Sequence, residues 1–243
     1  MVTQLMDTKE LEIWSSFNNR LISVLAHDLR QPFSSIIMTA EMLKFTQKPL
    51  DAEEFNMIME ELRDTACKSI ELLDGLLYWL KSKKEAFEYK TQPLLLNDLV
   101  NESNGLYIHD QQKKNIRFFN VVPERQIIYA HKQMLLFINR NILSNATKYS
   151  PTWGRISVSA TEDDNWVTVA FTDEGRGMTY NEVQRLFNIH ETIKYNDNIK
   201  GAGMALGICQ DMIRQMNGKI WAESIPGEGT TFYYALPTEN NRV

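Results

Sequence analysis

The chain has 243 residues, of which 43% are hydrophobic and 23% are charged, and its formal net charge is −5 at pH 7. These values are typical of an ordinary folded protein with one or two domains, and the negative charge with its scattered basic residues argues against a nucleic-acid partner. No apolar run approaches the ~18 residues that span a bilayer, and the N-terminus lacks a signal-peptide pattern, so we expect no membrane contact within this sequence.

The first part of the chain is predicted to form two long helices. Residues 9–46 contain no glycine and only Pro32 interrupts them, and apolar residues recur in steps of three, four or seven. TQKPLD at 46–51 is predicted to be a turn, with Asp51 as the N-cap of a second helix that extends to about Ala86. A hairpin alone buries its apolar face poorly, so we expect two copies to pair into a four-helix bundle. A coiled-coil spacer is the alternative.

The rest of the chain changes to mixed helices and mainly antiparallel strands, which predict an α/β sandwich. FEYKTQP at 87–93 has the composition of a linker. The predicted helices cover 94–115, 134–149, 181–187 and 204–216, the last ended by Asn217 and Gly218. The predicted strands cover 116–122, 125–130, 155–161, 166–173, 219–224 and 230–237. The fold class is therefore α+β, with a helical hairpin at 1–88, a linker at 89–93 and an α/β sandwich domain at 94–243.

One predicted helix of the second domain carries two asparagines on one face. In NILSNATKYS, Asn141 and Asn145 lie four residues apart, which is about one turn. Two carboxamides can hold a hydrated Mg²⁺ and triphosphate oxygens without adding negative charge, because Mg²⁺ keeps several waters and takes few protein ligands. Lys148 lies close behind them and can contact phosphate. Two capped or solvent-facing asparagines are the alternative.

Three glycine-containing stretches in the same domain can surround a nucleotide. DEGRG at 173–177 ends a strand, where Asp173 can accept a hydrogen bond from an exocyclic amine such as that of adenine. KGAGMALG at 200–207 opens a helix whose N-terminus offers N–H groups to phosphate, and the polar segment before it is typical of a mobile lid. PGEGTTF at 226–232 leads into the last strand, where Thr230 can add a hydroxyl near the base. Each stretch alone also fits a plain turn.

In combination and in this order, the motifs resemble those of the transmitter region of sensor histidine kinases, whose catalytic domain is of the type shared with gyrase-type ATPases. The resemblance extends from about residue 15 to residue 237. HDLRQP is similar to the family's histidine box, NILSNATKY to its asparagine box, DEGRG and GAGMALG to its two glycine boxes, and RLF to its phenylalanine box. The resemblance implies a dimerisation and histidine-phosphotransfer hairpin followed by an ATP-binding catalytic domain.

The resemblance also implies a set of site residues and two cofactors, ATP and Mg²⁺. Asn145 would be the metal ligand, Asn141 and Lys148 would contact phosphates, and Asp173 would bind adenine. The implied catalytic residues are His27, Asp28 and Gln31. The implied cofactor-binding residues are Asn141, Asn145, Lys148, Tyr149, Asp173, Gly175, Gly177, Met178, Lys200, Gly201, Ala202, Gly203, Met204, Ala205, Leu206 and Thr230.

The implied phosphoacceptor, His27, lies in a stretch with suitable chemistry. A neutral imidazole is a nucleophile near pH 7, since its ordinary pKa is about 6.5. By resemblance, Asp28 accepts a hydrogen bond from Nδ1–H and leaves Nε2 to attack the γ-phosphate. Adjacent residues do not share a helix face, so we expect a local distortion, which Pro32 supplies because it cannot donate to the carbonyl of Asp28. A polar residue on a coiled-coil surface is the alternative for His27.

Four positions bear on which activity this chain has. Gln31 stands where relatives usually carry the Thr or Asn thought to position water for dephosphorylating the partner; an amide can also orient water, which would allow phosphatase activity. Ala202 and Ala205 replace a hydroxyl residue and a glycine in the second glycine box. Asn141 stands where related ATPases carry a glutamate that acts as general base, and asparagine cannot abstract a proton, which favours a kinase.

We therefore expect ATP-dependent autophosphorylation on His27 and transfer to an aspartate of a separate response-regulator receiver domain, by a homodimer joined through the hairpin. The abrupt, helix-like start suggests a fragment, and we expect a cytoplasmic location, such as that of the inner part of a bacterial membrane sensor. The altered second glycine box motivates one alternative, a degenerate nucleotide-binding signalling scaffold. Another is a gyrase-type ATPase or serine kinase, against which the hairpin and Asn141 argue.

Overall fold

The computed structural model describes residues 30, 32–45, 50–82, 90–187 and 202–238. Contacts divide the chain into two compact units, Met1–Leu73 and Asp74–Val243, each of which is described by itself. Within the described ranges, no helix combines the length and the apolar character that crossing a membrane requires. The predicted domain limits at 88 and 93 stay predictions, although β1 (Gln92–Leu95) begins inside the predicted linker.

The first unit contains a helix at residues 32–45 and most of α2 (Ala52–Ser82). A reciprocal cap fixes the start of α2. Asp51 Oδ1 accepts hydrogen bonds from the N–H groups of Glu53 and Glu54 at 2.9 and 2.8 Å, and Glu54 accepts one from the Asp51 N–H at 3.2 Å. These bonds satisfy N–H groups that the helix itself cannot. The predicted N-cap at Asp51 is confirmed.

Both helices of the first unit carry one shielded and one exposed stripe. Side chains that are at least half-buried recur at helical spacing, and they include Pro32, Ile36, Thr39, Leu43, Ile58, Leu62, Thr65 and Ser69. Large apolar side chains at other positions are about half exposed or more, and they include Phe33, Ile37, Met38, Met42, Phe45, Phe55, Met57, Met59 and Ile70. Much of the apolar surface of these helices is therefore in contact with solvent in the single chain.

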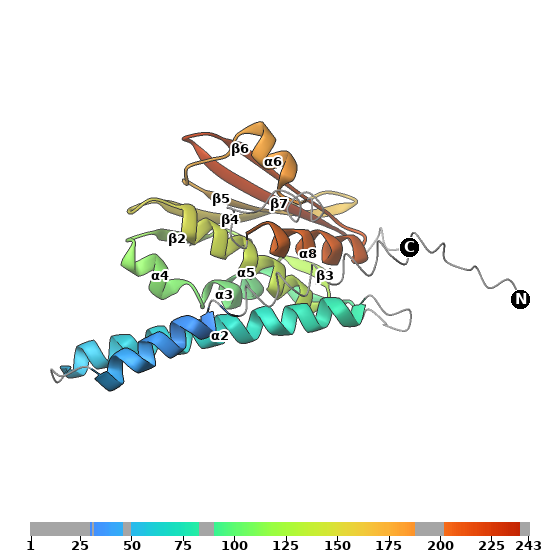
Figure 1. The fold of residues 1–243 in the computed structure, drawn as a ribbon. Coiled ribbons are helices and arrows are strands. Elements are labelled where there is room, and N and C mark those ends of the chain that lie inside the picture. Colours follow the sequence, from blue (N-terminus) through green and yellow to red (C-terminus); the bar gives the residue numbers. More distant parts are fainter. Residues whose placement is uncertain (1–29, 31, 46–49, 83–89, 188–201, 239–243) are drawn as a thin grey trace, which may run out of the picture. The chain divides into compact units, whose positions relative to one another are not determined.

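The second unit is built on a five-stranded sheet in the order β2-β4-β5-β7-β6 (Figure 1). Its strands are β2 (Arg117–Asn120), β4 (Arg155–Glu162), β5 (Trp166–Asp173), β6 (Lys219–Ile225) and β7 (Gly229–Pro237). β2 runs parallel to β4, and the other neighbours are antiparallel. β1 and β3 (Ile127–Ala130) form a separate antiparallel pair.

Helices cover one face of this sheet and complete a two-layer sandwich. The helices of this unit are α3 (Leu96–Asn104), α4 (Ile108–Lys113), α5 (Lys132–Tyr149), α6 (Tyr180–Arg185) and α8 (Ala202–Gln215). α5 packs against both α3 and α8, and α5 and α8 lie on the same side of the sheet (Figure 1). The core between these helices and the sheet includes Met134, Ile138, Ile142, Val169, Phe171, Leu206, Met212, Ile213 and Tyr234. The predicted α/β sandwich is confirmed.

The predicted helix at 94–115 is wrong in detail. The leucines at its start pair with β3 as part of β1, in the register Leu94↔Ile128, so tertiary pairing overrides a helix-like apolar run. The remainder is two helices rather than one, separated at Gly105, whose N–H still bonds the carbonyl of Asn101 at 3.1 Å.

The predicted end of α8 is confirmed by its geometry. Asn217 has a φ of 58°, and the Gly218 N–H bonds the carbonyl of Ile213 at 2.9 Å, which is a Schellman cap. A side chain at 218 would not fit, because its Cβ would lie 2.5 Å from the carbonyl oxygen of Ala235.

Candidate nucleotide-binding site

Asp173 is a buried carboxylate at the end of β5. It follows Val167, Val169 and Phe171 on the face of the strand that points into the core, and it is 5% exposed. Burial raises its pKa to about 6, while hydrogen bonds from the backbone N–H groups of Gly175 and Thr230 oppose this rise. An ionised carboxylate accepts up to about four hydrogen bonds, so Asp173 keeps acceptor capacity for an amino group of a ligand.

Gly175 allows the chain to pass between Asp173 and the end of α5. Its N–H donates to Asp173 Oδ1 at 2.8 Å. A Cβ at this position would lie 2.6 Å from that same oxygen and 3.0 Å from the carbonyl oxygen of Tyr149. Any side chain here would therefore displace the carboxylate or the last turn of α5. The structure thus brings together three predicted site residues, Tyr149, Asp173 and Gly175.

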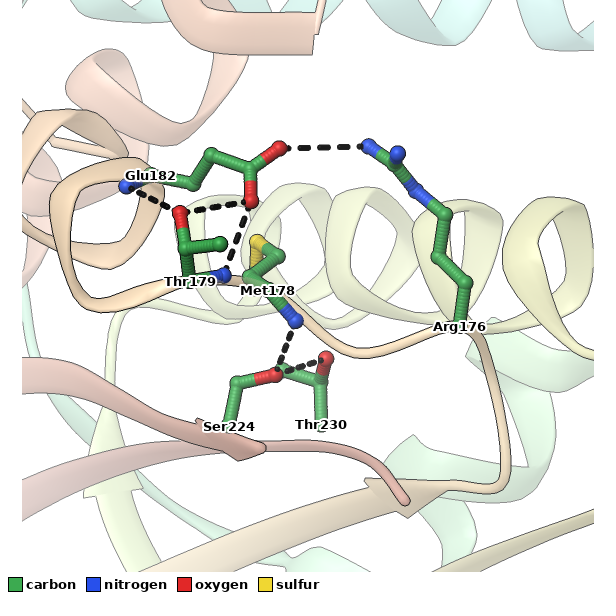
Figure 2. Close-up of polar contacts among 6 residues, drawn as sticks. All are labelled: Arg176, Met178, Thr179, Glu182, Ser224 and Thr230. Carbon is green, nitrogen blue, oxygen red and sulfur yellow. Dashed lines mark hydrogen bonds and ion pairs between the residues drawn. The ribbon is translucent and has the colours of Figure 1, made fainter. Parts of the chain in front are cut away.

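The loop after Gly175 is joined to the β6–β7 hairpin by Gly177 and Met178. Gly177 has a φ of 66°, and a Cβ there would overlap the carbonyl oxygen of Ile225. The N–H of Met178 donates to Ser224 Oγ at 2.8 Å (Figure 2). Glycine is needed at 177 for both its conformation and its close contact.

Ser224 on β6 is the shared partner of Met178, Gly229 and Thr230, and its role was not predicted from the sequence. Besides the bond from Met178, its hydroxyl donates to the carbonyl of Gly229 at 2.8 Å. It also lies 2.9 Å from Thr230 Oγ1 (Figure 2). Thr230 is 7% exposed and pairs directly with Asp173 across β5 and β7. A serine at the penultimate position of a strand carries no sequence signal that would have identified it.

A second group of contacts joins the loop to α6 and α5. Thr179 and Glu182 form a capping box, with the Thr179 N–H bonded to Glu182 Oε2 at 2.8 Å (Figure 2). Hydrogen bonds from Thr179 and, to a smaller degree, the nearby charge of Arg176 hold the pKa of Glu182 below its usual value. The Arg176 guanidinium is 3.7 Å from Glu182 and 5.7 Å from the ring centroid of Tyr149. These exposed contacts orient the loop more than they stabilise it.

α5 carries the predicted phosphate and metal ligands. The Asn141 Nδ2 donates to the carbonyl of Phe137 at 2.8 Å, which leaves its oxygen and one N–H for other partners. Asn145 is half-buried, and no described residue hydrogen-bonds its carboxamide. Lys148 is exposed, with its Nζ 5.2 Å from the ring centroid of Tyr149. Asn145 and Asn141 lie about one and two turns before Tyr149, on the helix that ends beside Asp173.

Lys114 caps the C-terminus of α5, and this was also missed from the sequence. Its Nζ donates to the carbonyls of Thr147, Lys148 and Ser150 at 2.9, 2.8 and 3.2 Å. A cation is favourable here because these carbonyls are the negative end of the helix dipole. The buried side chain of Gln111 also contacts this turn, because its Nε2 donates a hydrogen bond to Thr147 Oγ1 at 3.1 Å. The last turn of α5 is therefore held firmly.

Several predicted site residues lie outside the described part of the chain, namely His27, Asp28, Gln31, Lys200 and Gly201. Ala202, Gly203 and Met204 form the start of α8, and Ala205 is half-buried. Leu206 is 1% exposed and belongs to the core. The expected lid at 188–200 is likewise outside the described residues. Roles for these residues stay predictions.

Comparisons with known proteins agree with this architecture. Residues 17–82 match the family described as His Kinase A (phospho-acceptor) domain, and residues 131–240 match the histidine kinase-, DNA gyrase B-, and HSP90-like ATPases. The adaptive-response sensory kinase SasA of Synechocystis sp. is 28% identical over 238 residues, covering 95% of this chain and 62% of that protein. The chain thus spans about three fifths of the length of this curated relative.

Solved structures of histidine kinases have the same fold. The catalytic domain of histidine kinase ThkA is 22% identical with a TM-score of 0.54, covering 61% of this chain and 95% of that one. ThkA in complex with the response regulator protein TrrA is 21% identical with a TM-score of 0.59, covering all of this chain and 69% of that one. At these identities the likeness concerns the fold alone. With both family matches in one chain, this protein belongs to the sensor histidine kinases and comprises their transmitter region, a helical phospho-acceptor region followed by a mixed α/β ATPase-type domain.

Proposed function

We propose that this chain phosphorylates itself on His27 with ATP and passes the phosphoryl group to an aspartate of a response-regulator receiver domain. One observation carries the proposal. A phospho-acceptor region that includes residue 27 is joined, in the same chain, to an ATPase-type domain with a buried carboxylate beside a glycine loop. The first supplies a nucleophile and the second supplies a site for adenine. The response regulator bound to ThkA supports this class of partner.

Adenine would be bound through Asp173. Its carboxylate is ionised above a pH of about 6 and accepts a hydrogen bond from the exocyclic amine, which compensates the cost of burying the charge. The triphosphate would then extend toward the exposed edge of α5. There the remaining N–H of Asn141 and the ammonium group of Lys148 would contact phosphate oxygens.

Mg²⁺ would be held by Asn145. Among the described residues, no three His, Cys, Asp or Glu side chains gather into a metal site. The Asn145 carboxamide, which is half-buried and has no partner in the described part of the chain, fits an ion that takes few protein ligands. When bound, Mg²⁺ offsets charge on the phosphates.

In the reaction, the lone pair of His27 Nε2 attacks the γ-phosphorus while the bond to the β–γ bridging oxygen breaks and ADP leaves. Asp28 would accept a hydrogen bond from Nδ1–H and stabilise the positive charge that develops on the ring. Asn141 has no basic group to activate water, so an external nucleophile is favoured over hydrolysis. In the second step, a receiver carboxylate oxygen forms a bond to phosphorus as the P–N bond breaks.

The protein would act as a homodimer through the helices of the first unit. Their exposed apolar side chains, among them Phe33, Ile37 and Phe55, are each about half exposed in the single chain. A second copy that covers them would complete a four-helix bundle and remove this surface from water.

The test is incubation with γ-labelled ATP and Mg²⁺. We expect a protein label that is labile to acid, stable to base, and absent in His27→Gln. Label should move to an added purified receiver domain. Asn145→Ala should abolish labelling while the protein remains dimeric by light scattering.

Other outcomes of this experiment identify other functions. Acid-stable label would mean serine or threonine chemistry, and free phosphate without label would mean an ATPase. Nucleotide binding without turnover would mean a signalling scaffold. Unchanged labelling in Asn145→Ala would refute the metal assignment but not the kinase.

A further inference from the structure

We propose that Ser224 is a positioning residue that forces the Thr230 hydroxyl to accept hydrogen bonds from the bound base, so that the site selects a 6-amino purine over a 6-oxo purine. The proposal rests on the proposed nucleotide function of this site and adds a determinant of base specificity. Three hydrogen bonds surround the Ser224 hydroxyl, and those with Met178 and Thr230 are drawn in Figure 2.

The number of protons around Ser224 fixes the direction of each bond. Its hydroxyl has one hydrogen, which goes to the carbonyl of Gly229 at 2.8 Å, since a carbonyl can only accept. One of its lone pairs accepts the N–H of Met178 at 2.8 Å. The 2.9 Å contact with Thr230 must then be a bond in which Thr230 donates. Ser224 thereby uses its donor and both lone pairs.

Thr230 is left with lone pairs and no free hydrogen. If the Ser224 hydroxyl donated to Thr230 instead, the buried Gly229 carbonyl would lose this donor. Rotation of the Thr230 hydroxyl is therefore restricted as long as Ser224 is present.

Thr230 and Asp173 act on the same part of a ligand because they are paired directly across β7 and β5. Directly paired residues project their side chains on the same face, with Cβ atoms about 5 Å apart. Both residues are at most 7% exposed. Above a pH of about 6 the carboxylate of Asp173 also only accepts.

Two neighbouring acceptors match an amino group and repel a carbonyl. An exocyclic amine has two hydrogens, one for each acceptor, whereas a 6-oxo group presents only lone pairs to them. A site of fixed polarity discriminates strongly because the wrong ligand leaves buried groups unpaired.

The experiment compares the Kd values of ATP and inosine triphosphate for the full chain by calorimetry at pH 7.5. The two purines differ in the group at position 6 and in the proton that inosine carries on N1, and each variant is therefore judged by the change of its Kd ratio from that of the wild type. In Ser224→Ala the Thr230 hydroxyl can turn and donate to the 6-oxo group. We expect the ratio of the inosine triphosphate Kd to the ATP Kd to fall about fivefold or more, the effect of one hydrogen bond. Ser224→Thr, which keeps a hydroxyl, should retain the original ratio. Ser159→Ala, at a half-buried position of β4, is the matched control.

The double variant Ser224→Ala with Thr230→Val separates positioning from simple support. Without the Thr230 hydroxyl, loss of Ser224 should no longer change the ratio. The proposal would be overturned if Ser224→Ala weakened the binding of both nucleotides equally. It would also be overturned if removal of Ser224 lowered the Kd ratio by the same factor in the absence of the Thr230 hydroxyl. If Ser224→Ala fails to fold, Thr230→Val alone decides, because it should weaken ATP and spare inosine triphosphate, and equal losses would refute it. Wild-type protein that binds neither nucleotide would refute the proposed function itself.

Discussion

The buried carboxylate of Asp173 predicts that ATP binding weakens in mild acid. Its pKa is raised from 3.8 to about 6 by burial. In the free protein the contribution of this group to stability is fully present below pH 3.8 and is lost as the pH rises through about 6. At about 1.4 kcal/mol per pKa unit, the ionised form costs about 3 kcal/mol at most. A donated hydrogen bond from adenine offsets that cost, so binding favours the ionised form.

The size of the effect follows from the fraction ionised. At pH 5, one unit below the pKa, only about a tenth of Asp173 is ionised, so the Kd for ATP should rise about tenfold between pH 7 and pH 5. Calorimetric titrations at several pH values measure this. The phosphates of ATP also titrate near pH 6, and Asp173→Asn corrects for them because it removes only the carboxyl group. An equally steep pH dependence in Asp173→Asn would refute the reasoning.

Two further predictions concern the support of this site. Gly177→Ala should lower the free energy of unfolding by at least about 3 kcal/mol in urea titrations, since the added Cβ would overlap the Ile225 carbonyl. Gly227 also has a positive φ, but an added Cβ there would meet open space, so Gly227→Ala should cost only about 1 kcal/mol. Similar losses in the two variants would contradict this prediction. Lys114→Met should cost about 1–3 kcal/mol because three carbonyls lose their cap, and the exposed Lys90→Met should cost almost nothing; equal costs would refute the cap.

Local signals in the sequence were enough to predict much of this architecture. Alternating apolar residues predicted β5 at its observed limits, and an aspartate before a helical pattern predicted the cap at Asp51. The end of α8 followed from Asn217 and Gly218. In each case the structure is determined by residues close together in the chain, through periodicity or capping.

The features that were missed depend on contacts between distant residues. Ser224 meets Met178 across 46 positions, and Lys114 reaches Thr147 across 33. β1 forms because β3 is available to pair with it, and its leucines alone fit a helix equally well. A serine or a lysine has no distinctive pattern along the chain, so its role emerges only when the fold supplies its partners.

The position of β7 has a consequence for how the domain is made. It follows β5 and β6 in the chain, yet it lies between them and carries Thr230 opposite Asp173. A nascent chain that stops before Gly229 leaves the edges of β5 and β6 without their shared neighbour, and such open edges promote aggregation. Premature termination before β7 should therefore yield insoluble protein rather than a weakened enzyme.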